Sequence, residues 1–289
     1  MKKPQVITIV VAAVAIVLLL AFGRTVPKAG PKPVAGETTQ DHDHAGHEDA
    51  AGGFSIDTVL AMSKKELPAG QALRLDLLEK SITRGDVKKQ RLDVYHQLAH
   101  FWKDTAKAFI PYAWFTAESA RLENSEKSLN FAAQIFLNQL SQVENEPTRH
   151  WMAEQAKDLF EKTLSVNPAN DSAQVGLGAT YLYGGIGTPM EGIGKIRAVV
   201  EKDSTNVYAQ MTLATASLMS GQQQKAQERL ETVLKLQPQN IQAILMLGDL
   251  YEKDGNKDQA IQWYSKAVKL VQRADIRTEL EKRIEALKK

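Results

Sequence analysis

Histidines beside carboxylates are the first side chains in this sequence whose types and spacing suggest chemistry. His42, His44 and His47 lie among four carboxylates in the stretch 41–49. Neutral imidazoles and carboxylates suit zinc, copper or nickel, so this stretch is a weak candidate metal site. It offers no fixed geometry and no supporting hydrogen bonds that would orient a ligand. We favour the alternative, a disordered acidic tract, and we expect no resident metal and no cofactor.

A second pair of imidazoles, His96 and His100, is spaced one helical turn apart. This spacing resembles the zinc motif His-Glu-x-x-His, in which the glutamate is the general base. Position 97 is glutamine, so the base that metalloprotease chemistry needs is missing. We interpret the pair as two partly exposed histidines beside an apolar helical stripe.

The glycine-rich segment 183–190 could in principle approach a phosphate. It lacks the pattern Gly-x-x-x-x-Gly-Lys-Ser/Thr, and Lys195 is followed by Ile196 where a magnesium-binding hydroxyl would be needed. We interpret the segment as an elaborated turn that offers an exposed contact loop. No Ser-His-Asp arrangement or carboxylate pair stands out elsewhere in the sequence, and we expect that the chain is not an enzyme.

The composition excludes further classes of function. With a formal net charge of +2 over 289 residues, the chain has no electrostatic case for binding nucleic acid. Cysteine is absent, which excludes disulfides, thiol catalysis and cysteine-zinc sites. Lys and Arg alternate with Glu and Asp along the predicted helices, as on a solvated helical surface.

The N-terminus carries a long apolar run, from Val6 to Phe22, interrupted only by Thr8. At about 1.5 Å per residue this run just crosses a hydrocarbon core of roughly 30 Å. We therefore predict that residues 1–24 form a signal anchor or transmembrane helix. The alternative is a signal peptide cleaved near Gly23, because the residues before it resemble a small-x-small cleavage pattern. A short basic tail inside and the bulk of the chain outside is the commoner orientation.

The composition then shifts to Pro, Gly, Ala, Thr and charged residues over 25–53, which indicates a flexible linker. After the linker, apolar residues recur at helical spacing up to the C-terminus. We predict an N-terminal helical region over 54–124, repeats over 125–274, and a capping helix over 275–289. Within these, the predicted helices are 55–64, 69–84, 86–105, 107–124, 125–143, 148–166 and 274–289.

Aromatic residues are concentrated in the segment 101–115. One reading is a packed core at the start of the helical array. The other is a contact surface for a partner, a second copy of the chain or the membrane interface, where Trp and Tyr are common. The candidate contact residues are Trp102, Tyr112, Trp114 and Phe115.

Residues of the same kind recur 34 positions apart in the C-terminal half. Ala226 and Ala260 are 34 residues apart, as are Leu213 and Leu247. A larger residue in place of either alanine would force two helices apart and cost roughly 1–3 kcal/mol. Turns containing Gly221 and Gly255 would end the first helix of each pair, and Pro238 would stop the second helix. A period of 34 residues is the spacing of a helix-turn-helix repeat.

These residues resemble the tetratricopeptide repeat. One unit carries Leu247, Gly248, Tyr251, Ala260 and Tyr264 at the positions that mark the repeat, and Leu177, Gly178 and Tyr181 open an earlier unit. The resemblance covers 125–270 well and 86–124 weakly. It implies an all-α solenoid in which the first helices of successive pairs line a concave groove.

The resemblance also implies which residues line that groove, by their positions in each repeat. They are Val175, Ala179, Leu182, Tyr183, Tyr208, Met211, Thr215, Met219, Leu245 and Asp249. The set is mostly apolar, and the Lys and Asn residues of the family's carboxylate clamp are absent, so we predict a groove for an apolar or amphipathic segment. The alternative is that several of these residues are buried core.

As a whole the sequence resembles bacterial, single-pass, membrane-anchored tetratricopeptide proteins of the cell envelope. This predicts a scaffold or chaperone-like adaptor that binds a protein or peptide, with its bulk on the periplasmic side of the cytoplasmic membrane. An alternative is a structural subunit of a larger envelope complex, of the secretion or cytochrome-assembly type. Metal capture by the linker histidines is a weaker alternative.

Overall fold

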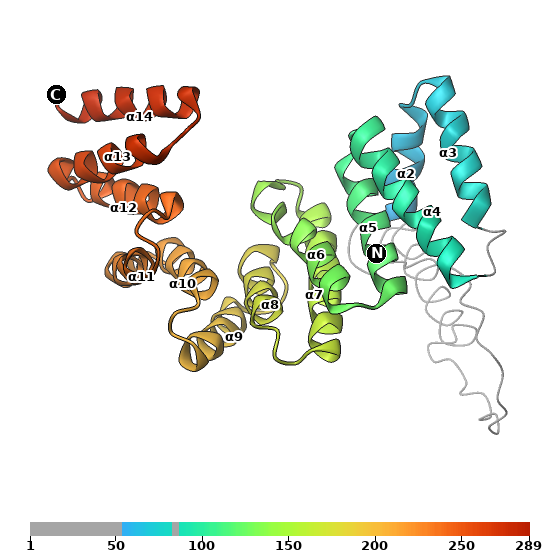
Figure 1. The fold of residues 1–289 in the computed structure, drawn as a ribbon, viewed down its shortest axis with the longest axis horizontal. Coiled ribbons are helices and arrows are strands. Elements are labelled where there is room, and N and C mark those ends of the chain that lie inside the picture. Colours follow the sequence, from blue (N-terminus) through green and yellow to red (C-terminus); the bar gives the residue numbers. More distant parts are fainter. Residues whose placement is uncertain (1–53, 83–86) are drawn as a thin grey trace, which may run out of the picture. The chain divides into compact units, whose positions relative to one another are not determined.

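The computed structural model describes residues 54–82 and 87–289 (Figure 1). This part of the chain is helical throughout and has no strand, which confirms the predicted all-α architecture. The predicted membrane helix (1–24) and linker (25–53), with His42, His44 and His47, lie outside the described residues. Among the helices of 54–82 and 87–289, none is long and apolar enough to cross a bilayer.

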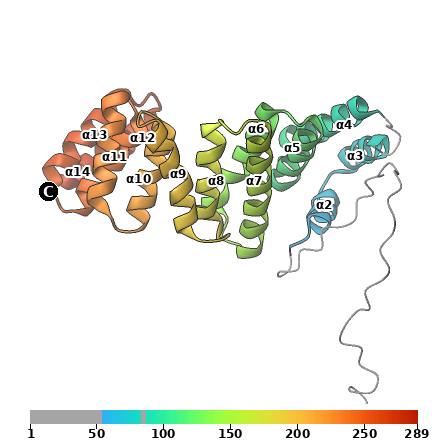
Figure 2. The ribbon, with the colours of Figure 1, turned by 90° about the horizontal axis from the view of Figure 1, so that it is seen from below.

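The helices follow one another with short connections (Figure 2). In chain order they are α2 (Ile56–Lys65), α3 (Ala69–Ile82), α4 (Lys88–His100), the π-helix η1 (Phe101–Thr105), α5 (Phe109–Glu123), α6 (Glu126–Leu137), the short 3-10 helix η2 (Leu140–Gln142), α7 (Glu146–Val166), α8 (Asp171–Gly184), α9 (Pro189–Lys202), α10 (Val207–Met219), α11 (Gln223–Leu236), α12 (Ile241–Lys253), α13 (Lys257–Leu270) and α14 (Ala274–Leu287).

Neighbouring helices pack in pairs: α4 with α5, α6 with α7, α8 with α9, α10 with α11, and α12 with α13. The second helix of one pair then packs on the first helix of the next, as α5 does on α6 and α11 on α12. The first helices also contact each other directly, α6 with α8 and α8 with α10. This is the helix-pair stacking of an α-solenoid, in which each unit buries its apolar face against its neighbours.

Asparagine side chains start several helices of the regular part. The side-chain oxygens of Asn170, Asn206 and Asn240 each accept a hydrogen bond from a backbone N–H three residues on, at 2.7, 3.0 and 3.0 Å. Such a cap satisfies one of the amide groups that a helix N-terminus leaves without an intrahelical partner. α9 begins with a capping box of Thr188 and Glu191, with Pro189 at the first helical position.

The predicted small residues lie where helices of a pair touch. Ala226 and Ala260 are fully buried. At the α8–α9 crossing glycine takes the place of alanine, because a Cβ on Gly192 would lie 2.4 Å from the carbonyl oxygen of Gly178. The two backbones therefore approach more closely there than any larger residue allows. The predicted turns are also present, with Gly221 and Gly255 at φ 72° and 75°.

The α4–α5 pair departs from the regular geometry. The predicted single helix over 86–105 is instead α4 continued by a π-helix, in which the Ala106 N–H donates to the carbonyl of Phe101 at 3.0 Å. Lys107 follows with φ 54°, a left-handed conformation that is unfavourable for a residue with a Cβ. The two features together reverse the chain in a very short connection before α5.

The next connection also differs from prediction. The helix expected over 125–143 ends at Leu137, and η2 fills part of the remaining segment. α7 starts at Glu146, two residues earlier than expected, because Asn145 caps it and Pro147 is tolerated in the first turn. The connection between α6 and α7 therefore runs over 138–145.

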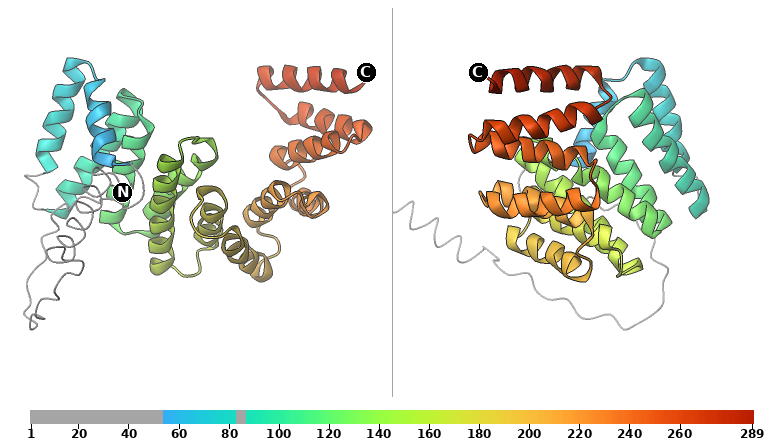
Figure 3. Two further views of the ribbon diagram at one scale, coloured as in Figure 1. Left: turned by 180° about the vertical axis from the view of Figure 1, so that it is seen from behind. Right: turned by 60° about the vertical axis from the view of Figure 1, so that its left-hand side comes forward.

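The last helix, α14, packs on α13 and completes the C-terminal core through Leu280 and Ile284 (Figure 3). Polar contacts of Arg283, which we call the C-terminal lock, hold α14 against α12. Arg283 of α14 pairs with Asp249 and Glu252 of α12 at 2.9 and 2.7 Å, and its guanidinium lies 4.6 Å from the ring centre of Tyr264. α14 therefore acts as the predicted cap.

At the other end, the described chain enters the body of the protein through a single aromatic contact. Phe54 stacks on Trp151 of α7, with ring centres 4.5 Å apart and planes 27° from parallel. Ser55 then caps α2 through the N–H of Thr58. The entry contact thus falls on α7, well along the helical array.

Candidate functional site

The first helices α6, α8 and α10 carry a group of polar and aromatic side chains that meet across helix boundaries. Gln134 of α6 donates from Nε2 to the Tyr208 hydroxyl of α10 at 3.4 Å. Tyr183 of α8 is hydrogen-bonded to Thr215 of α10 and lies near Tyr208. Phe131 lies one turn before Gln134 on α6 and is 57% exposed. We call Phe131, Gln134, Tyr183, Tyr208 and Thr215 the inner strip.

The two phenols of the inner strip are uncharged at neutral pH. Burial raises the pKa of Tyr183, and the nearby Tyr208 raises it further. Burial likewise raises the pKa of Tyr208, against the hydrogen bond from Gln134. Both hydroxyls remain O–H donors that can also accept, so the strip suits an uncharged polar backbone beside apolar side chains.

Three of the predicted groove residues are buried instead. Val175, Ala179 and Met211 are packed into the core between helix pairs and offer no surface to a ligand. The reason is that consecutive first helices contact each other, so residues facing the next helix are covered. The alternative reading, buried core, is correct for these three.

The other predicted groove residues reach the surface to different extents. Leu182, Tyr183, Thr215 and Leu245 are half-buried, whereas Tyr208, Met219 and Asp249 are exposed. Asp249 is already bonded to Arg283 and to the Tyr264 hydroxyl, so it serves the C-terminal lock. Whether the remaining residues bind a ligand stays a prediction, and Tyr183, Tyr208 and Thr215 are the ones that the structure brings together.

A cleft of about 290 Å³ lies between α4 and α6 and has α5 as its floor. We call it the α4–α6 cleft. Its size matches the lower end of ligand pockets, about 300 Å³, so it has room for one large side chain. Its lining residues are His96, Ala99, His100, Lys103, Tyr112, Thr116, Ser119, Ala120, Glu123, Ser128 and Phe131.

The imidazole and ammonium groups of the cleft come from α4 and η1, whereas α5 supplies hydroxyls and the carboxylate of Glu123. His100 Nδ1 lies 3.2 Å from Asp104 Oδ2, and Lys103 Nζ lies 5.5 Å from the ring centre of Tyr112. Across the cleft stands the exposed ring of Phe131. The arrangement places cationic and imidazole groups opposite an apolar wall.

As with the groove residues, some of the predicted partner-contact residues are buried and others reach the surface. Trp102 and Phe115 are buried, so for them the core reading is correct. Tyr112 lines the cleft. Trp114 is half-buried; its ring lies 6.1 Å from Trp151 and 5.8 Å from the Arg121 guanidinium.

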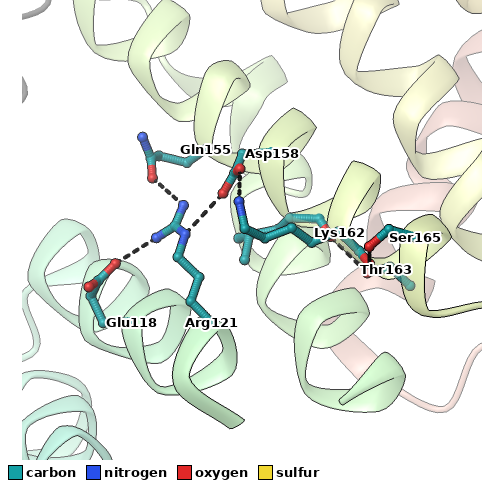
Figure 4. Close-up of polar contacts among 8 residues, drawn as sticks. Glu118, Arg121, Gln155, Asp158, Lys162, Thr163 and Ser165 are labelled. Atoms are coloured by element: carbon teal, nitrogen blue, oxygen red, sulfur yellow. Dashed lines mark hydrogen bonds and ion pairs between the residues drawn. The ribbon is translucent and has the colours of Figure 1, made fainter. Parts of the chain in front are cut away.

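Arg121 belongs to a polar network that joins α5 to α7 (Figure 4). Its guanidinium donates to Glu118 at 2.7 Å, to Gln155 at 2.7 Å and to Asp158 at 2.9 Å. Although burial opposes it, hydrogen bonding to Lys162 and the charge of Arg121 hold the pKa of the Asp158 carboxyl below its usual range. All these groups are mutually satisfied, which indicates a structural role.

The described residues contain no group of three or more His, Cys, Asp or Glu side chains arranged to hold a metal ion. His96 and His100 line the cleft without a third ligand. The linker histidines fall outside the described ranges, so metal capture there stays a prediction.

Phe131 is the functional candidate that sequence reasoning missed. The buried stripe of α6 is Leu129, Ala132, Ala133 and Phe136. Phe131 lies off this stripe, and an aromatic residue on the polar side of an amphipathic helix was the available signal.

The stacked helix pairs have the arrangement of an α-solenoid, a class of fold that includes the tetratricopeptide-repeat proteins. Residues 217–278 match the family model described as tetratricopeptide repeat. This segment therefore consists of tetratricopeptide repeats, as the residues at 34-residue spacing predicted. No curated protein matches the sequence.

Several solved structures are similar to this chain. MamA from Desulfovibrio magneticus RS-1 is 20% identical over 64% of this chain and 96% of that chain, with a TM-score of 0.44. A thermophilic tetratricopeptide protein of Thermus thermophilus, TTC0263, is 15% identical over 70% and 98%, with a TM-score of 0.48. PilW, described as a type IV pilus biogenesis factor, is 19% identical over 68% and 92%, with a TM-score of 0.46. At these values the similarities say nothing about what this chain binds.

Proposed function

We propose that this chain is a protein-binding scaffold, held at the bacterial cytoplasmic membrane by residues 1–24, that binds an apolar or amphipathic segment of a partner protein along its inner strip. The repeat fold supports protein binding in general. The apolar run at 6–22 is the support for the anchor, and the basic residues before it favour the folded part lying outside the cytoplasm.

The observation that carries the proposal is the pair of exposed aromatic side chains on the first helices. Phe131 of α6 and Tyr208 of α10 are 57% and 37% exposed, and Gln134 connects them by its hydrogen bond to Tyr208. Large aromatic residues bury much surface at little cost in conformational entropy, which is why they dominate binding hot spots. Their place on the first helices gives a ligand a continuous track.

The inner strip meets the α4–α6 cleft at Phe131, which belongs to both. A bound segment would therefore place one large side chain in the cleft and continue over Gln134 and Tyr208. The neutral tyrosine hydroxyls would bond its backbone, and Phe131 would pack on its apolar side chains.

The test is photocrosslinking in native membranes from a benzoylphenylalanine placed at Tyr208, followed by mass spectrometry. Met211 is unsuitable as a probe because it is buried. The matched control is the same probe at Leu236, an exposed apolar residue on α11 away from the strip. Protein adducts at 208 and none at 236 support the proposal. Equal adducts at both positions, or none at 208, contradict it.

A second candidate function, a fixed subunit of an envelope complex, is favoured by one observation. Met190, at the elaborated turn before α9, is 67% exposed, more than any other large apolar side chain described. A subunit that docks through this turn would give one discrete crosslink at 190 and co-purify at constant stoichiometry. A chaperone-like adaptor would instead give a heterogeneous ladder at 208.

A further inference from the structure

Helix α3 presents an outer side that is apolar and basic. Leu73 and Leu77 lie one turn apart, so they share a face, and each is 63% exposed. Arg74 is exposed beside them. The exposed residues of α3 are Ala69, Gly70, Leu73, Arg74, Leu77 and Lys80, and they include no carboxylate.

The two carboxylates of α3 are directed elsewhere. Asp76 and Glu79 both pair with Lys64 of α2, at 2.5 and 2.6 Å. The charge of Lys80 also lowers the pKa of the Asp76 carboxyl. The carboxylates of the helix are thus paired with Lys64, although their side chains stay 40% and 38% exposed, and Arg74 carries a positive charge next to the two leucines.

This apolar side is not accounted for by packing within the described chain. α3 buries Leu75 on its opposite side, against the core it shares with α4 and α5. A helix that is apolar on both sides is ordinarily covered on both. Met62 of α2 and Val87 before α4 are also more than half exposed, and Lys88 and Lys89 are exposed next to Val87.

We propose that the outer side of α3, formed by Leu73, Arg74 and Leu77, rests on the anionic lipid headgroups of a bilayer. The inference rests on the proposed anchor, which would keep α3 close to that bilayer. Leucines flanked by basic residues are the composition of helices that lie in a membrane interface, where apolar burial and attraction to anionic lipid act together.

Chain length permits this contact. Thirty-three residues separate Phe22, the end of the apolar run, from Ile56, the start of α2. Fully extended they span at most about 120 Å, so the linker is long enough for α3 to reach the bilayer surface. Two leucines and one arginine give a weak contact by themselves, and the anchor supplies the high local concentration that makes a weak contact effective.

The experiment uses the full chain reconstituted into vesicles. The sequence has no cysteine, so Leu73→Cys gives a single labelling site for an environment-sensitive fluorophore. We expect a blue shift and quenching by spin-labelled lipid in vesicles containing phosphatidylglycerol. In phosphatidylcholine vesicles, and with the added change Arg74→Glu, the contact should weaken about fivefold per basic residue lost or neutralised. Leu236→Cys is the matched control and should show neither effect.

The outcomes separate this inference from the proposed anchor. If the chain floats with the vesicles and the label at 73 is not quenched, the α3 contact is wrong and the anchor stands. If the chain does not float, the anchor and this inference both fail. A blue shift at 73 that precedes the addition of lipid and grows with protein concentration would mean that a second copy covers α3, and would overturn the inference.

Discussion

The two ends of the helical array differ in whether their apolar face is covered. At the C-terminal end α14 closes the core with Leu280 and Ile284, and Arg283 locks it to α12. At the N-terminal end α3 turns Leu73 and Leu77 outward. A solenoid needs a polar cap at each end to stay soluble on its own. Within the described residues, the apolar face is therefore covered at the C-terminal end and open at α3.

The C-terminal end also has the more regular helix caps and backbone geometry. The C-terminal pairs begin with asparagine caps at Asn206 and Asn240, whereas α4 and α5 begin at Val87 and Ala108 without a side-chain cap. The π-helix, the left-handed Lys107 and the α4–α6 cleft all belong to the N-terminal part. Backbone strain of this kind tends to gather at functional sites, whereas the regular repeats supply stability.

The largest expected difference between the two ends concerns two leucines, Leu280 of α14 and Leu77 of α3. Leu280→Ala removes a side chain that is 6% exposed, and should lower the free energy of unfolding by roughly 2–4 kcal/mol. Leu77→Ala, at the opposite end, should change it by less than about 0.5 kcal/mol. Urea denaturation without lipid measures both. Equal losses would mean that α3 is buried against another part of the protein and would end the comparison.

Two glycines test how closely helices approach at each end. A Cβ at Gly248 would lie 2.5 Å from Cε1 of Tyr264, whose hydroxyl is fixed by two carboxylates, so Gly248→Ala should cost about 1–3 kcal/mol. Gly70 in α3 has nothing within 4 Å, and Gly70→Ala should gain up to about 0.5 kcal/mol from helix propensity. A loss at position 70 would contradict an open outer side of α3.

The C-terminal lock should be sensitive to alkali. Burial raises the pKa of Tyr264, and its hydrogen bonds to Asp249 and Glu252 raise it further. Because the folded pKa exceeds the unfolded value of about 10, the stabilisation is complete below pH 10 and is lost as the pH rises above it. Tyr264→Phe should cost about 1 kcal/mol at neutral pH. A wild-type advantage that stays constant up to about pH 11 would show that the phenol does not titrate with folding.

The smallest expected effect concerns helix caps. Asn240→Ala should destabilise by about 1 kcal/mol, since the Ala243 N–H loses its acceptor. Val87→Asp places an acceptor where α4 has none and should stabilise by roughly 0.5 kcal/mol. Thermal unfolding of the two variants side by side is sufficient. If Val87→Asp destabilises, the start of α4 is constrained by contacts beyond its cap.

The sequence predicts the repeats well, because their determinants are local. Ala226, Ala260, the glycine turns and Pro238 each act within their own helix pair. A period of 34 residues then extends that local geometry along the chain. The family model matches where this spacing is strictest, over 217–278.

The candidate site is harder to predict because it depends on contacts between pairs. Val175 and Met211 occupy groove positions of the repeat, yet both are buried in apolar clusters that join one helix pair to the next. The cleft is lined by residues of α4, η1, α5 and α6, and nothing in the residues of 101–105 predicts that α4 continues as a π-helix. The position of Phe131 on the polar side of α6 is visible in the sequence. The hydrogen bond of nearby Gln134 to Tyr208 is not, because the two residues are 74 positions apart.

The stack of Phe54 on Trp151 also has a mechanical meaning. Any tension transmitted along the chain ahead of residue 54 reaches the folded body at α7, through one aromatic contact with ring centres 4.5 Å apart. α2 and α3 lie behind that contact in the chain, so they bear no load until the stack separates. A pull from the N-terminus would therefore act first on the Phe54–Trp151 stack, and on α2 only after that stack has separated.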